Sequence, residues 1–148
     1  MKKLRVALIG NGGICRGAHV PQYLKMTDIV EVVALCDIIL ERAETFRDSY
    51  FPNADVYENY ADVIARDDID CVDICTPNYL HSIIAVAALN AGKHVFCEKP
   101  DAVSVEEVEK MQRAQLESGK VLMIMRNNRH LNTSKYLKEY IADGKAGE

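Results

Sequence analysis

The sequence predicts an α/β fold built on a doubly wound parallel sheet. Short apolar runs, many of them rich in β-branched residues, alternate along the chain with longer segments of helical periodicity. The first run, residues 4–9, is almost unbroken in its apolar character, as expected of a strand that is buried on both faces. A glycine cluster and a helix-compatible segment follow it directly. Alternation of this kind favours right-handed crossovers, which place helices on both faces of a parallel sheet.

The first half of the chain supplies four of the expected strands. The first helix should begin near Gly13, and should end early or kink at Pro21, because proline lacks an N–H and clashes with the preceding turn. The β-branched run IVEVVALC predicts the second strand. The remaining elements of this half are a helix over 38–50, a short strand at 56–57, a brief helix over 60–65 and a strand over 71–75.

The second half contains the clearest helical pattern. Apolar residues recur at helical spacing over 80–91, and Gly92 follows where a left-handed cap is needed. After a strand at 94–97, Ser104 and Glu107 predict a capping box for a helix that ends at Gly119. A last strand is expected over 121–125, and then a polar stretch and one amphipathic helix that ends at Gly144.

Composition excludes several classes of protein. The 148 residues are 49% hydrophobic and 27% charged, which is typical of one globular domain. A net charge of -4 with scattered basic residues argues against a nucleic-acid partner. The apolar stretches are too short to span a bilayer and the N-terminus lacks a cleavable-signal pattern, so we expect no membrane association and a cytoplasmic location.

The five cysteines predict neither a disulfide framework nor a metal site, because they are odd in number and form no CxxC pair. We expect them to pack in the core of a protein from a reducing compartment. Cys15 and Cys97 adjoin the motifs described next.

The glycine cluster stands between the first expected strand and the first expected helix, so the chain there runs in the order strand, tight turn, helix. Unpaired N–H groups and a partial positive charge at a helix N-terminus attract phosphate, and residues without side chains let it approach. We therefore expect a dinucleotide pyrophosphate to bind at Gly10, Asn11, Gly12, Gly13 and Ile14. Cys15 stands where Gly or Ala is usual, which should spread the helix slightly from the strand.

Asp37 follows the second strand, 22 residues after Cys15. A carboxylate at this position accepts hydrogen bonds from both hydroxyls of the adenine ribose, and together with the glycine turn it predicts a Rossmann dinucleotide-binding fold. The same carboxylate repels a 2′-phosphate, and no Arg or Ser stands at position 38, so we expect NAD, with NADP less favoured. The alternative is that Asp37 only caps the following helix.

Two later turns leave strands at the carboxyl edge, where ligands of open α/β sheets bind. At the first turn, Thr76, Pro77 and Asn78 enter a helix, and Asn78 and His81 could face the cofactor. Asn78 is also a good N-cap, and His81 alone is best interpreted as an exposed helix residue.

The second turn contains Glu98, Lys99 and Pro100. A Lys beside a cationic nicotinamide is discouraged from carrying its own charge, which suits a group that hydrogen-bonds a substrate hydroxyl and passes on its proton. The competing interpretation is an exposed Glu–Lys pair that contributes about 0 to 1 kcal/mol.

These motifs together resemble a known family. The segments GNGGICRGAHVPQYL, DICTPNYLHSIIAVAALNAGKHVFCEKP and RNNRH, with Asp37, are similar to the N-terminal half of the glucose-fructose oxidoreductase / inositol dehydrogenase / rhizopine catabolism (Gfo/Idh/MocA) family. The resemblance implies a nicotinamide-dependent oxidoreductase that acts on sugars, polyols or related hydroxyl and carbonyl compounds. It implies that residues 76–78 lie along the cofactor, Glu98 near the nicotinamide ribose and the catalytic Lys99 at the substrate. It also makes Lys99-Pro100 a candidate cis bond.

The resemblance assigns residues 1–125 to a dinucleotide-binding domain. Residues 126–148 then form a connecting segment and helix that lead to a substrate domain absent from this chain, where the Asp and His of the family's proton relay lie. Exposed apolar side chains on the last helix predict self-association, as in a homo-oligomer, or a poorly ordered tail. Two alternatives stay open: a non-enzymatic dinucleotide sensor, and a complete single-domain protein that binds another nucleotide.

Overall fold

The computed structural model describes residues 2–147 and contains one six-stranded sheet in which every pairing is parallel. The strand order is β3-β2-β1-β4-β5-β6. The first three strands are therefore added in one direction from β1 and the last three in the opposite direction, so the strand order switches between β1 and β4. The predicted doubly wound Rossmann fold is therefore confirmed. The strands are β1 (Leu4–Ile9), β2 (Val30–Cys36), β3 (Asp55–Tyr57), β4 (Cys71–Ile74), β5 (His94–Cys97) and β6 (Leu122–Ile124).

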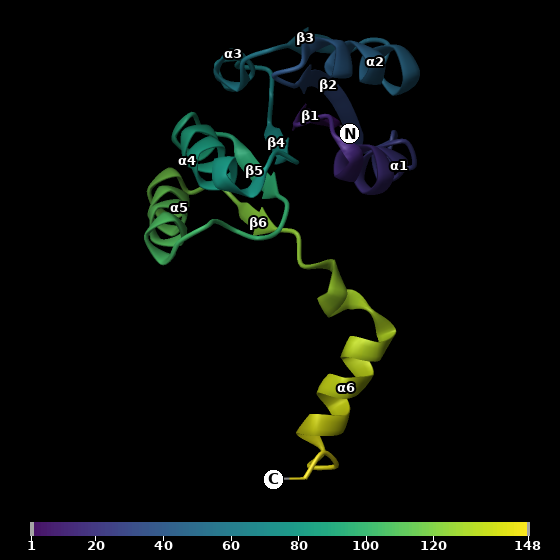
Figure 1. The fold of residues 1–148 in the computed structure, drawn as a ribbon, viewed down its shortest axis with the longest axis vertical. Helices are drawn as coiled ribbons and strands as arrows, with labels where there is room; N and C mark the ends of the chain where they lie inside the picture. Colours follow the sequence, from purple (N-terminus) through teal and green to yellow (C-terminus); the bar gives the residue numbers. More distant parts are fainter. Residues whose placement is uncertain (1, 148) are drawn as a thin grey trace.

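Helices cover both faces of the sheet (Figure 1). On one face, α3, α4 and α5 bury apolar side chains against alternate residues of the strands; on the other, α1 and α2 do the same. Phe46 of α2 is the largest of the fully buried side chains. The helices are α1 (Val20–Tyr23), α2 (Leu40–Tyr50), α3 (Tyr60–Ile64), α4 (His81–Asn90), α5 (Val105–Ser118) and α6 (Asn132–Ala142).

The helix that follows the glycine turn differs from the expectation at Pro21. The backbone is helical from Gly13, passes through a π-helical turn, η1 (Cys15–His19), and continues through Pro21 to Tyr23. Pro21 is the second residue of α1 and directly follows the π-helical turn, in which Val20 N bonds Cys15 O five residues back, so the wider turn comes where the proline supplies no N–H. The helix therefore does not end at the proline, and the irregular turn precedes it.

The helix-ending glycines and the capping box predicted for the second half of the chain are confirmed. Gly92 and Gly119 follow α4 and α5 with φ of +76° and +66°. Ser104 Oγ accepts a hydrogen bond from Glu107 N at 3.3 Å, while Glu107 Oε2 accepts from Val103 N at 3.2 Å. The box thus reaches one residue further back than its usual form.

The chain after β6 leaves the sheet. It forms a 3-10 turn, η3 (Asn127–His130), and then α6, which extends away from the rest of the molecule in Figure 1. No residue of α6 is buried, and Tyr136, Leu137 and Ile141 are each more than half exposed. Across residues 2–147, no helix has the length and apolarity needed to cross a membrane.

Candidate dinucleotide site

The glycines of the β1 turn serve two different purposes. Gly10 has φ +93°, and a Cβ built on it would lie 2.7 Å from the carbonyl carbon of Cys75. Its N–H donates to Cys36 O at 2.8 Å, so the turn is packed against the exits of both β2 and β4. A Cβ on Gly12 or Gly13, by contrast, would meet no atom within 4 Å. The space that a phosphate needs is therefore beside Gly12 and Gly13, at the start of the helix.

Asp37 joins the glycine turn to the end of β2. Its Oδ2 accepts a hydrogen bond from Asn11 N at 2.8 Å and its Oδ1 accepts from Ile39 N at 2.9 Å. Arg42 Nη1 lies 3.9 Å from Oδ1. Helix α2 begins at Leu40 with Ile39 at its N-cap, so Asp37 is not the N-cap residue that the alternative interpretation required.

The turn after β4 contains a buried hydroxyl. Thr76 Oγ1 has no hydrogen-bond partner among residues 2–147. Asn78 is exposed and begins the 3-10 turn η2 (Asn78–Leu80), for which Pro77 is the N-cap. Asn78 therefore caps no helix, and its side chain is available to a ligand.

His81 is not the exposed helix residue that its sequence position indicated. Its side chain is 1% exposed, with Nδ1 2.6 Å from Pro100 O and Nε2 2.9 Å from Thr76 O. The ring therefore ties the turn after β4 to the turn after β5. Contact between His81 and a cofactor stays a prediction, because His81 does not line the cleft described below.

Glu98 and Lys99 follow β5 directly, and Glu98 is buried whereas Lys99 is exposed. Glu98 is 7% exposed; its Oε2 accepts from Lys99 N at 3.0 Å, and its Oε1 lies 3.1 Å from His19 Nε2. Lys99 is exposed and borders a cavity of about 380 Å³ together with Arg126 and Arg129. The interpretation as an exposed Glu–Lys pair is wrong because the carboxylate of Glu98 is buried against His19. The Lys99–Pro100 bond is cis.

A buried polar cluster on the α1 face of β4 was missing from the sequence-based prediction. Asp73 is fully buried, and its Oδ2 lies 2.7 Å from His19 Nδ1 and accepts from Tyr23 OH at 2.9 Å. Cys75 Sγ donates to Asp73 Oδ1 at 3.7 Å. A ring nitrogen of His19, a carboxylate oxygen of Asp73 and the sulfur of Cys75 lie within 4.8 Å of one another, as metal ligands would. The contact between His19 and Asp73 has hydrogen-bond length, so the three side chains form a hydrogen-bonded cluster.

The cluster makes His19 a cation. Burial by itself lowers the pKa of His19, but the hydrogen bond and charge of Asp73 and the hydrogen bond to Glu98 outweigh it and raise the pKa to about 9. Burial and the charge of Asp73 raise the pKa of Tyr23, so its hydroxyl stays a donor. Hydrogen bonding with Cys15 and burial raise the pKa of Cys75, which stays a thiol.

A cleft of about 310 Å³ runs along the carboxyl edge of the sheet. Gly12, Gly13, Asp37, Arg42 and Thr76 are among the residues that line it. The open helix start, the ribose-competent carboxylate and the unpartnered Thr76 hydroxyl are the groups that a dinucleotide needs. The residues present therefore fit a nicotinamide dinucleotide.

Two signals in the sequence could have revealed the cluster. Asp73 interrupts an apolar strand, CVDIC, that was expected to be buried, and a buried carboxylate requires a partner. His19 and Tyr23 are four residues apart and therefore lie on one side of a helix. Neither signal identifies the partner, because β4 and α1 are far apart along the chain.

The fold and the site define an NAD(P)-binding Rossmann domain. The chain matches the family model of the Gfo/Idh/MocA oxidoreductases, described as "Oxidoreductase family, NAD-binding Rossmann fold", over residues 4–125, and it belongs to that family. The matched segment includes the glycine turn, Asp37 and both later turns.

The curated relatives that the chain resembles include dehydrogenases. It is 36% identical to the inositol 2-dehydrogenase of Salmonella typhimurium over 146 residues, which are 98% of this chain and 43% of the relative. The chain thus spans less than half the length of the curated relatives it matches.

Solved structures of similar sequence also share the fold of this chain. The WlbA dehydrogenase of Bordetella pertussis in complex with NADH and UDP-GlcNAcA has a TM-score of 0.90 and 29% identity, over 99% of this chain and 44% of that one. The 3-ketoreductase KijD10 of Actinomadura kijaniata, in complex with TDP-benzene and NADP, has a TM-score of 0.85 and 28% identity, over 97% and 44%.

Proposed function

We propose that this chain is the NAD-binding part of an oxidoreductase that transfers a hydride between a nicotinamide cofactor and a sugar, polyol or related hydroxyl or carbonyl compound. The observation that carries the proposal is the meeting of four features at one sheet edge. The open glycine turn, Asp37 and the turn at 76–78 contribute to the cleft, and His81 ties the turn at 98–100 to Thr76. The chemistry of the named relatives supports it.

Each feature has a place along the extended cofactor. Backbone N–H groups at 10–14 would hold the pyrophosphate, and Asp37 would accept the adenine-ribose hydroxyls. Thr76, with its unpartnered hydroxyl, and the exposed Asn78 would follow the cofactor toward Glu98 at the nicotinamide ribose. When bound, the nicotinamide supplies the hydride acceptor or donor.

We propose that NAD is preferred to NADP. Two backbone N–H bonds hold the Asp37 carboxylate at the end of β2, where its negative charge repels a 2′-phosphate. Arg42 also lines the cleft, 3.9 Å from Asp37 Oδ1, and its positive charge would partly offset that repulsion.

Calorimetric titration of the chain with NAD and NADP tests this preference. We expect Asp37→Ala to weaken NAD binding about 10-fold or more, as for loss of hydrogen bonds to a charged group. Arg42→Ala should leave NAD affinity nearly unchanged and weaken NADP further. Unchanged NAD affinity in Asp37→Ala would exclude the ribose role.

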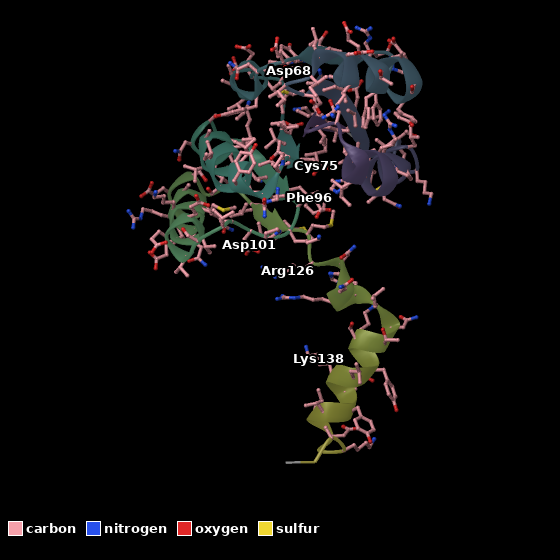
Figure 2. The ribbon with its side chains drawn as sticks, viewed as in Figure 1. Asp68, Cys75, Phe96, Asp101, Arg126 and Lys138 are labelled. Carbon is pink, nitrogen blue, oxygen red and sulfur yellow. The ribbon has the colours of Figure 1, made fainter. Side chains whose placement is uncertain are left out.

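Lys99 is proposed as the residue that hydrogen-bonds the reacting hydroxyl and takes its proton. Its position on the cavity shared with Arg126 and Arg129 supports this role. Arg126 is itself held by an ion pair with Asp101 (Figure 2). In a protein carrying this chain, Lys99→Met should abolish turnover of sugars or polyols while NAD affinity is retained. Retained turnover would exclude the role of Lys99.

The proposal includes a domain boundary. Residues 1–125 would form the dinucleotide-binding domain, and residues 126–148 would connect it to a substrate domain. The exposed apolar side chains of α6 support a further packing partner, either that domain or a second copy.

The five free cysteines are consistent with a cytoplasmic setting.

A further inference from the structure

We propose that His19 is a positioning residue: as an imidazolium shared by Asp73 and Glu98, it holds the Glu98 carboxylate in a fixed position at the cofactor edge, and so controls affinity for the nicotinamide half of the dinucleotide. The last step of this inference rests on the proposed function. The first step, the cationic bridge, depends only on the unliganded chain.

The geometry requires two protons on the ring. His19 Nδ1 lies 2.7 Å from Asp73 Oδ2, and Nε2 lies 3.1 Å from Glu98 Oε1. Carboxylate oxygens are acceptors, and a neutral imidazole donates through one nitrogen only. A neutral His19 would therefore direct a lone pair at one of the two carboxylates, with the side chains almost completely buried. Only the imidazolium satisfies both contacts.

Three elements hold the ring in this position. The groups that face it come from β4 and the residue after it, from the turn after β5 and from its own helical segment: Asp73, Cys75, Glu98 and Cys15. The two carboxylates are opposite in charge to an imidazolium, and Cys75 and Tyr23 are donors to Asp73. Phe96 packs at 6.0 Å between ring centroids and excludes water from that side. Figure 2 labels Cys75 and Phe96, which mark this region between α1 and the strands.

Glu98 is thereby left with a free acceptor position on Oε2. Its Oε1 is occupied by His19, and its Oε2 accepts from Lys99 N at 3.0 Å. Each carboxylate oxygen has two lone pairs, so Oε2 can also accept a ribose hydroxyl. Because the two protein contacts fix the plane of the carboxylate, the position of that acceptor depends on His19. Loss of the imidazolium proton would remove the contact at Oε1 and release the carboxylate from its fixed position, so the fixed acceptor would be lost.

Nuclear magnetic resonance of the unliganded chain tests the bridge. Nitrogen shifts of the His19 ring should show both nitrogens protonated at pH 7 and a single deprotonation near pH 9. The Glu98→Gln chain should replace the carboxylate acceptor at Nε2 with a neutral amide oxygen, so its His19 should deprotonate at lower pH than in the wild type. A His19 ring that is neutral at pH 7 in the wild-type chain would overturn the inference.

Fluorescence titration with NADH tests the consequence for binding. We expect His19→Gln to weaken NADH binding about 10-fold or more, the effect of losing one hydrogen bond to a charged group. In the Glu98→Gln background the same substitution should have no further effect, because His19 acts through Glu98. Tyr23→Phe is the matched control: it removes a hydrogen bond to the same Asp73 oxygen without touching Glu98, and should leave NADH affinity unchanged.

The pH profile separates positioning from a general loss of structure. Wild-type affinity for NADH should fall as pH rises through about 9, whereas the affinity of Glu98→Gln should not change over this range. Equal pH profiles for the two chains, or additive effects in the double variant, would overturn the inference. If the wild-type chain bound neither NADH nor NADPH, the proposed function would fail while the resonance titration still decided the charge of His19.

Discussion

Replacing Gly10 with Ala tests why the first glycine of the turn is needed. The new Cβ would lie 2.7 Å from Cys75 C and 2.8 Å from both Cys75 O and Thr76 N. All three are backbone atoms, and they cannot retreat easily because Cys75 N donates to Ile9 O at 2.8 Å within the sheet. The substitution also forces a residue with a side chain to adopt φ +93°.

The expected cost follows from two contributions. A left-handed conformation costs a non-glycine residue about 1–2 kcal/mol, and overpacking a rigid site costs about 1–3 kcal/mol. Together they predict that Gly10→Ala lowers the free energy of unfolding by about 2–5 kcal/mol. This is a large fraction of the about 5–15 kcal/mol available to a typical domain.

Urea denaturation followed by far-ultraviolet circular dichroism measures this loss. Gly12→Ala is the matched control, because a Cβ there meets no atom within 4 Å. Its unfolding free energy should stay within about 0.5 kcal/mol of wild type, while its NADH affinity falls because the methyl group occupies the phosphate's approach. The reasoning is refuted if Gly10→Ala is as stable as wild type, or if the two variants are equally destabilised.

Three further predictions concern stability, each measured by urea denaturation. Because the pKa of His19 is raised from 6.5 to about 9, its contribution is complete below pH 6.5 and is lost as pH rises through about 9. The wild-type unfolding free energy should therefore fall by at most about 3 kcal/mol over that interval from this group, and His19→Gln should lose that part of the slope; an unchanged slope contradicts the assignment. Ser104→Ala removes the cap of α5 and should cost about 0.5–2 kcal/mol, and no loss would mean that the Glu107 contact suffices. Phe46→Ala should cost about 3–5 kcal/mol, against less than about 0.5 kcal/mol for Leu116→Ala on the exposed side of α5; similar costs would contradict the assigned core.

Local patterns were sufficient for the sheet and for the outline of the cofactor cleft. Strand character depends on runs of β-branched residues, and helix ends depend on capping residues and glycines, so β5 and α5 were predicted with nearly their observed bounds. The glycine turn and Asp37 were found because the order of strand, turn, helix and strand sets their spacing. Parallel strands bring their carboxyl ends to one edge, which was enough to expect the turns at 76–78 and 98–100 to share a site with them.

Contacts between elements distant in sequence could not be predicted in this way. Asp73 is 54 residues and Glu98 is 79 residues from His19 along the chain. Only the packing of the first helix on β4 brings the three side chains together. For the same reason His81 was interpreted as exposed, although the return of the chain after β5 buries its ring between two carbonyl groups.

The sequence by itself therefore determined the fold class, the family, and the glycine turn and Asp37 that line the cleft, because these follow from short-range periodicity and spacing. Tertiary structure alone decided the electrostatics behind the cleft: which carboxylates flank the His19 ring, why the pKa of His19 is raised and how Glu98 is held. The physical reason is that burial and hydrogen-bond partners set the state of an ionisable group, and both come from residues far away in the chain.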